Sequence, residues 1–338
     1  MSYRDIVGIA KQSAFATKTT AASAFMFPPV TKESLAIERE NITIEETSGT
    51  RAPSSLAYGT SSVKGDIEGA IRPTSFPLFL AGAFGVPAST VLSGGAFSHV
   101  FDSTAASALL PLSIYTVNTD PVSSITDLYF GCYVDELEFT AAVDEYVMYK
   151  AAIVGAGLDT TQSAPAATGD TSARFTALNV SGSLGVSGQA KAGINLKDCT
   201  IKYTNGLSTD DKILGSASLA SVPLGNAECE VEFTIVDTSA FKTHYHTYFT
   251  DATTPVDLEL ELTITGATIS GVHAYKVIIN VARFQYTEVP VEIDAGSVMS
   301  EMKVKGRACL SSGGDLVTVT VVNNTTNAAG VAYGGAQS

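Results

Sequence analysis

The chain has 338 residues, of which 45% are hydrophobic and 16% charged, so it can bury a large core and global disorder is excluded. Its 20 basic and 34 acidic residues give a net charge of −14, which excludes the basic surface that tight nucleic-acid binding requires. No apolar run approaches the roughly 20 residues of a membrane span.

The start of the chain, MSYRDIVGIAKQSAF, lacks a basic segment followed by an apolar one. A secretory signal is therefore not expected, and folding in a cytoplasm is predicted. The four cysteines are widely spaced and form no CxxC pair, which argues against a zinc ribbon. Cys199 and Cys229 fall in strand-like patterns, so they are expected to be small buried hydrophobic residues.

A strand followed by a short helix is predicted in VKGDIEGAIRPTSFPLFLAGAFG, residues 63–85. Thr74 or Ser75 is a suitable N-cap, proline follows in the first turn, and Gly85 is a suitable end. Three apolar residues spaced by four predict an amphipathic helix with one apolar face: Phe76, Leu80 and Phe84. The turn before the helix contains no glycine, so a phosphate-binding loop is not expected.

Three pairs of segments are similar and occur in the same order, which predicts an internal duplication. The pairs are 40–49 with 197–206, 65–76 with 229–240, and 147–155 with 298–306. The second copy repeats the helix signal, with Asp237 or Thr238 as the cap and an apolar row at Phe241, Tyr245 and Phe249.

The segments around these matches alternate apolar and polar residues, are rich in Val, Ile, Tyr, Phe and Thr, and end at Gly, Asp or Pro. They predict a mainly β fold of two tandem domains, each with one short flanking α-helix. The expected divisions are a first domain at 1–157, a linker at 158–185, a second domain at 186–322 and a flexible tail at 323–338. The end of the linker is also compatible with a first strand of the second domain, and 315–322 is a predicted strand.

Catalytic and metal-binding constellations are not found in the sequence. His244 and His246 are two residues apart, which on a helix points their rings to different faces, unlike the spacing of four in a metal helix. No GxSxG motif or nucleophile with a motif partner is present. No cofactor, metal or enzymatic activity is predicted.

Acidic residues occupy alternate positions of several predicted strands and therefore share a sheet face. The members are Asp66 and Glu68; Glu228, Glu230 and Glu232; and Asp257, Glu259 and Glu261. Such a face is either an ordinary solvated surface or the acidic wall of a channel, and composition alone favours the solvated surface.

Two short motifs bear on this choice because they resemble the signatures of tailed-bacteriophage tail tube proteins. The first lies in GIAKQSAFATKT and the second is a V-x-G-x-I strand leading to the helix. The residues that carry the resemblance are Gly8, Lys11, Gln12, Ser13, Phe15 and Thr17, and then Val63, Gly65, Ile67, Ile71, Arg72 and Pro73. Ala16 departs from the glycine expected in the first motif.

The resemblance implies β-sandwich subunits whose inner sheets join around a ring into one β-barrel, with rings stacked into a hollow tube. It implies passage of double-stranded DNA through the lumen without adhesion, and partners that include a tape-measure protein, a baseplate or tail-tip protein and a tail terminator. The location implied is the virion tail, assembled in the cytoplasm of a host bacterium. Asp66, Glu68, Glu230 and Glu232 lie at matching positions of the two copies, so they are the predicted lumen-lining residues.

Most such tubes have six single-domain subunits in a ring, so a duplicated chain predicts trimeric, pseudo-hexameric rings. The competing arrangement is a hexamer in which one domain lines the tube and the other decorates it. Contacts between rings are expected from residues 18–30, the loop at 47–60 and the C-terminal tail. The alternatives to a tube subunit are a head–tail connector, a decoration protein and, less favoured, a sugar-binding adhesin.

Overall fold

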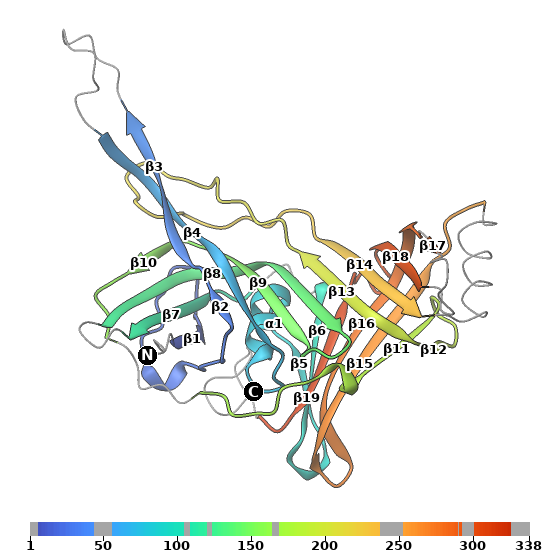
Figure 1. The fold of residues 1–338 in the computed structure, drawn as a ribbon. Coiled ribbons are helices and arrows are strands. Elements are labelled where there is room, and N and C mark those ends of the chain that lie inside the picture. Colours follow the sequence, from blue (N-terminus) through green and yellow to red (C-terminus); the bar gives the residue numbers. More distant parts are fainter. Residues whose placement is uncertain are drawn as a thin grey trace.

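The computed structural model describes residues 6–43, 56–104, 109–119, 124–163, 169–236, 253–289, 291–292 and 301–325. The fold is mainly β, which confirms the predicted class, and its strands pair in antiparallel fashion into one large sheet system (Figure 1). The described residues contain one α-helix, α1 (Phe76–Phe84), which follows the predicted strand.

Four strands of the first half form a continuous sheet in the order β3-β4-β9-β8. Buried and outward side chains alternate along strand β4. Val63 and Ile67 are buried, whereas Asp66 and Glu68 point outward. The bounds are Ala36–Thr43 for β3, Leu56–Ala70 for β4, Met148–Gly155 for β9 and Ser124–Ala142 for β8. The short strand β2 (Lys32–Glu33) also pairs with β4.

Four strands of the second half repeat this order as β13-β14-β18-β16. In both halves a strand pair comes first, a long hairpin follows, and a later strand inserts between the two. The bounds are Leu196–Thr204 for β13, Glu228–Val236 for β14, Glu301–Ala308 for β18 and His273–Glu288 for β16, with β17 (Val291–Glu292) paired to β18.

The two four-strand sheets are joined edge to edge, because β8 pairs with β13 from Glu136↔Thr204 to Ala142↔Asp198. We call these pairs the β8–β13 joint and the eight strands together the inner sheet. Strands from the two halves of the chain thus form one continuous hydrogen-bonded surface (Figure 1).

The remaining strands extend the sheet system away from the inner sheet. In the first half, β1 (Ile6–Lys11), β7 (Leu112–Thr119) and β10 (Gly157–Asp159) assemble on the beginning of β8. In the second half, β15 (Leu258–Ser270) pairs with β11 (Val180–Val186), which is the strand allowed for at the end of the predicted linker. The others are β5 (Ala88–Val91), β6 (Phe97–Asp102), β12 (Ala192–Ile194) and β19 (Thr318–Asn323).

One apolar core extends through both halves of the chain and includes Ile67, Leu137, Ile201, Phe233 and Val304 from the inner sheet. Strand β19 crosses between halves as well, since it pairs with β16 on one side and β6 on the other. The predicted strand at 315–322 is therefore present, and the second half completes a sheet that the first half begins.

Helix α1 begins after Ser75, carries Pro77 in its first turn and ends at Gly85, whose φ of 86° suits glycine. Every residue of the helix is buried, because β1, β6 and β8 pack around it. The expectation of a single apolar face is therefore wrong, and the helix is apolar all round. Phe84 also contacts Tyr203 of the second half, with ring centroids 4.6 Å apart.

The registers refine the predicted duplication. Thr43 pairs with Leu56, whereas Thr200, its counterpart in the sequence match, pairs with Glu232. The two halves thus share a strand order. Residues matched between 40–49 and 197–206 nevertheless occupy different positions in the two ladders. The second-copy helix signal at Asp237, Thr238 and beyond, and His244 and His246, lie outside the described residues.

Two extended features reach beyond the body of the fold. Strand β3 and the first part of β4 project from the body as a two-stranded arm (Figure 1). Residues 205–227, which we call the strap, run from β13 back across the first half before β14 begins.

Candidate functional site

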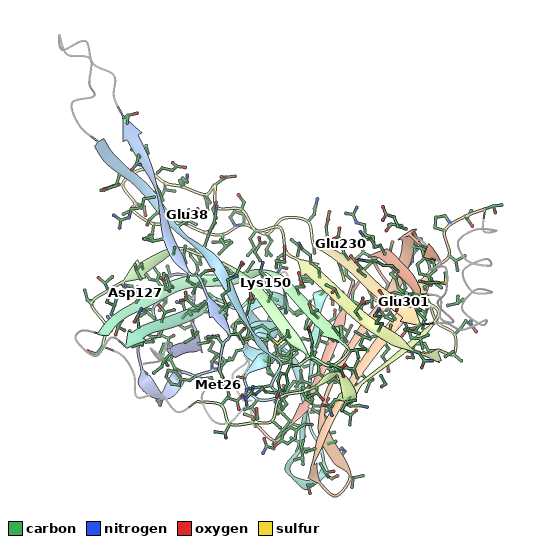
Figure 2. The ribbon with its side chains drawn as sticks, in the orientation of Figure 1. Met26, Glu38, Asp127, Lys150, Glu230 and Glu301 are labelled. Atoms are coloured by element: carbon green, nitrogen blue, oxygen red, sulfur yellow. The ribbon has the colours of Figure 1, made fainter. Side chains whose placement is uncertain are left out.

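The side of the inner sheet that faces away from the core is covered by charged side chains, and we call it the polar face. Six neighbouring strands supply it: β4, β9, β8, β13, β14 and β18. Apolar residues alternate with these charges and point into the core, which is the pattern of a sheet with one buried side. Figure 2 gives the positions of Lys150 and Glu230, which are separated by β8 and β13.

All four residues predicted to line a lumen lie on this polar face. Asp66 and Glu68 lie on β4, and Glu230 and Glu232 lie on β14. The structure therefore brings both pairs to one surface, although three strands separate them.

The polar face carries more acidic than basic side chains. Its nine acids are Asp66, Glu68, Glu136, Glu138, Asp198, Glu228, Glu230, Glu232 and Glu301. Its six bases are Lys64, Lys150, Lys202, Lys303, Lys305 and Arg307. Acids thus outnumber bases on the face, and most of its carboxylates have a cation nearby.

One line of directly opposed residues alternates in charge across seven strands, and we call it the charged row. The registers give its order as Lys32, Glu68, Lys150, Glu138, Lys202, Glu230 and Arg307. Opposite charges at facing positions stabilise a sheet, whereas like charges there destabilise it. The row crosses the β8–β13 joint without a break in the alternation.

Ion pairs fix the cations of the row to carboxylates on neighbouring strands. The Lys150 ammonium lies 3.2 Å from Asp66, and the Lys202 ammonium lies 2.8 Å from Glu136. The hydrogen bond from each ammonium to its carboxylate, together with the charge of the flanking acids, raises the pKa of Lys150 and of Lys202. Both cations therefore stay charged wherever the chain is folded near neutral pH.

Other pairs continue the pattern at the ends of the face. Lys32 lies 2.9 Å from Glu68, and Arg307 lies 2.5 Å from Glu228. Glu232 contacts Lys303 and lies 4.0 Å from Lys305.

Sequence reasoning found the acids and missed most of their cationic partners. A signal for them exists in EMKVKGRA, where Lys303, Lys305 and Arg307 alternate as the acids of β14 do. The partnership of Lys150 and Lys202 has no such local signal, because it depends on how distant strands align.

The third group of acids predicted to share a sheet face, Asp257, Glu259 and Glu261, lies at and just before β15. Glu259 and Glu261 on β15 both accept a hydrogen bond from Lys191 at 2.7 Å, and Asp257 pairs with Arg283 at 2.8 Å. Strand β15 pairs with β11 and with β16, the last strand of the inner sheet, so these acids lie beyond the six strands that supply the polar face.

Buried polar contacts stabilise the β8–β13 joint on the core side of the inner sheet. The Asn205 side-chain amide donates to the backbone oxygens of Ala83 at 3.0 Å and Val134 at 2.9 Å. The Asp135 carboxylate accepts from the backbone N–H of Leu207 at 2.7 Å. The end of β13 is thereby tied to both α1 and β8.

The strap fastens the second half onto the arm of the first. The backbone N–H of Ser61 donates to the Ala217 oxygen at 2.9 Å, and Lys212 pairs with Glu40 at 2.5 Å. Leu219 and Val222 form a small apolar cluster with Val154. The strap is thus held by polar contacts to the arm and by apolar contacts to β9.

Buried titratable groups serve packing in this fold. Cys199 and Cys229 are free and buried, as predicted, and burial raises the pKa of the Cys229 thiol to about 12. His99 is fully buried between Ser89 Oγ at 2.8 Å and Asn323 Oδ1 at 3.2 Å, and burial lowers its pKa. Its ring joins β6 of the first half to β19 of the second.

Within the described part of the chain, His, Cys, Asp and Glu side chains form no group of three or more that could hold a metal ion. Of the described helices, none has the length and apolarity needed to cross a membrane.

Comparison with known proteins agrees with the architecture. A family model described as phage tail tube protein matches residues 4–327, nearly the whole chain. No match was found among curated proteins. A mainly β fold with a polar inner sheet and a family match across nearly its full length lead to one conclusion: the chain belongs to the phage tail tube protein family, as a structural component of the virion tail.

Proposed function

We propose that three copies of this tail tube subunit form a ring, that rings stack into a hollow tube, and that the polar face lines its lumen. The observation that carries the proposal is the repeated strand order, β3-β4-β9-β8 and then β13-β14-β18-β16, joined at the β8–β13 joint. Each half then supplies one of six equivalent wall segments, so three chains complete a ring.

The two ends of the inner sheet suit such a closure. In the described residues, β3 pairs with β4 alone, and residues 285–288 of β16 pair with β18 along one side. Open strand edges bind other strands, and ring closure removes them. In the repeated strand order β16 corresponds to β8, and β3 corresponds to β13. The β8–β13 joint within one chain therefore has the same form as the contact that β16 of one chain would make with β3 of the next.

A hexamer with one lining half and one decorating half fits these contacts less well. Both halves contribute to one uninterrupted face, and the charged row continues from one to the other. A decorating half would leave half of that face outside the lumen.

The lumen would be acidic and would guide double-stranded DNA from the capsid to the host cell. DNA carries one phosphate charge per roughly 1.7 Å of its axis, so a wall with excess carboxylates keeps it from adhering. Asp66, Glu68, Glu230 and Glu232 are the proposed lining acids. No enzymatic step is part of this role.

The remaining proposed partners are those that the resemblance to tail tube proteins implies. A tape-measure protein would occupy the lumen before DNA enters, a baseplate or tail-tip protein and a tail terminator would close the two ends, and assembly would take place in the cytoplasm of the host bacterium. The proposed contacts to the adjacent ring are residues 18–30, residues 47–60 and the C-terminal tail.

Electron microscopy of purified tubes tests the ring. End-on averages should contain three copies of the 35.1 kDa chain, with six similar wall segments. Six copies in a ring would overturn the proposal, as would a chain that forms no rings under conditions that keep it folded.

Replacing the four lining acids by lysine tests the lumen. Microscopy establishes whether the variant still assembles into tubes. In virions that carry the variant, DNA delivery should fail or slow. Normal assembly with unchanged delivery would remove these four residues from the lumen.

A further inference from the structure

We propose that the acids of the polar face mask its lysines and arginine, so that double-stranded DNA finds no free cation on this surface. The inference rests on the proposed function, because it assigns a task to the surface that would face the lumen. It concerns the cations, which the acidic character of the face does not explain.

The cations of the face are accessible enough to bind phosphate. The side chains of Lys150 and Lys202 are 39% and 38% exposed, so burial does not withdraw them from a passing duplex. Proteins bind DNA without sequence preference through such side chains, because each one releases condensed counterions from the phosphates. A wall that carries them needs another means to avoid adhesion.

The registers give each central cation carboxylates on both sides. Lys202 contacts Glu136 on β8, with Glu138 opposite on that strand and Glu230 opposite on β14. Lys150 lies in the same way between β4 and β8, where Glu68 and Glu138 oppose it. Neighbouring strands are about 4.8 Å apart, so these charges act on one another well inside the roughly 10 Å screening length at 0.1 M salt.

The same arrangement accounts for the presence of cations on an acidic face. Carboxylates alone at facing positions would repel one another across every ladder and destabilise the sheet. A cation between two acids removes that repulsion, and the excess of acids on the polar face comes from the carboxylates beside the row, such as Asp66, Glu136 and Glu232. The surface is thereby both stable as a sheet and repellent to phosphate.

Removing the mask around one cation should create affinity for DNA. The variant Glu136→Gln/Glu138→Gln/Glu230→Gln keeps the size of each side chain and removes the three carboxylates that contact or directly oppose Lys202. The control Asp144→Asn/Glu145→Gln/Asp210→Asn loses the same three negative charges at exposed positions off the polar face. Asp144 has a φ of 64°, which asparagine also adopts readily.

Binding is measured on the soluble, unassembled chain with a fluorescent duplex of roughly 20 base pairs at about 50 mM salt, followed by a salt titration. The triple variant should bind at least about tenfold more tightly than the control, with a steeper salt dependence, and Lys202→Ala added to it should reduce the gain, leaving the part that comes from Lys150 and Arg307. Equal affinities of variant and control would overturn the proposal, as would a gain that Lys202→Ala leaves undiminished.

Circular dichroism and thermal melting establish that each variant is folded. Should the triple variant fail to fold, Glu138→Gln alone is the second test, because Glu138 faces both central lysines and accepts a hydrogen bond from the Thr140 hydroxyl, which glutamine can also accept. It should bind about threefold more tightly than Glu145→Gln, and no difference between them would overturn the proposal. Ring formation is scored separately by microscopy, so a wild-type chain that forms no rings counts against the proposed function and not against masking.

Discussion

Glu136 on β8 and Lys202 on β13 form an ion pair of 2.8 Å across the β8–β13 joint. The pair links residues that are far apart in sequence, and it lies on the polar face beside the charged row. The joint therefore combines backbone ladder bonds, a surface ion pair and the buried contacts of Asn205 below it. These layers respond differently to mutation.

The buried layer of the joint should matter most for stability. Asn205→Ala removes the donors that serve the Ala83 and Val134 carbonyl oxygens, and loss of buried hydrogen bonds costs about 2 kcal/mol. Urea unfolding should give a lower midpoint with an unchanged slope. Asn226→Ala, at an exposed position of the strap, should stay within about 0.5 kcal/mol of wild type. Equal effects of the two substitutions would contradict this role of Asn205.

The strap should be released by a single apolar truncation. Leu219 is 3% exposed against Val154, so Leu219→Ala should weaken its attachment by about 2 to 3 kcal/mol. The readout is hydrogen exchange of the Ser61 amide, which donates to Ala217 of the strap and should exchange faster. Leu214→Ala, at a fully exposed leucine, is the matched control. Protection of Ser61 that survives Leu219→Ala would mean that polar contacts alone hold the strap.

A close backbone approach should make Gly65 intolerant of substitution. A Cβ at this position would lie 2.4 Å from the Ser34 carbonyl oxygen, a backbone atom that cannot turn away. Gly65→Ala should lower the free energy of unfolding by about 2 to 3 kcal/mol, measured by urea titration. Gly193→Ala meets no atom within 4 Å and should be nearly neutral. A neutral Gly65→Ala would indicate that β4 shifts without penalty.

Acid should weaken the fold in part through His99. Burial lowers its pKa in the folded chain below the unfolded value of about 6.5, so the unfolded chain takes up a proton first as the pH falls. The stability contributed by neutral His99 is complete above about pH 6.5 and is lost as the pH falls toward the folded pKa. Unfolding free energies at about pH 7.5 and pH 5 should therefore differ less in His99→Gln than in wild type.

The control for this titration is His273→Gln, because His273 is partly exposed and bonded to Ser93 Oγ at 3.1 Å. Comparison of the two variants separates the effect of the buried position from that of replacing a histidine. A His99→Gln variant with the full wild-type loss between the two pH values would assign that loss to the carboxylates of the sheet.

Local patterns predicted the elements of this fold well. The alternation in VKGDIEGAI predicted strand β4 and placed Asp66 and Glu68 on one face, since neighbours along a strand point to opposite sides. The capping residues and Gly85 predicted the ends of α1. The all-round burial of the helix escaped prediction, because it depends on β1, β6 and β8 closing around Leu78 and its neighbours.

The charged row marks the limit of sequence reasoning about the site. Acids on alternate positions of β4 and β14 are visible in the sequence, but the partner of each is set by register. Lys150 opposes Glu68 and Glu138 only because β9 lies between β4 and β8. A shift of one residue in either ladder would turn these side chains to the other face, and nothing local to Lys150 specifies that alignment.

The β8–β13 joint also has a consequence for how the two halves change over time. Both sides of this contact are encoded in one chain and meet during its folding, so it forms at an effective concentration set by the connecting residues and not by the amount of protein in the cell. A substitution at Glu136 alters this contact alone. A substitution at Lys202 can compensate for it without changing any other strand edge. Covalent linkage thus lets one half diverge from the other, a freedom that identical subunits do not have.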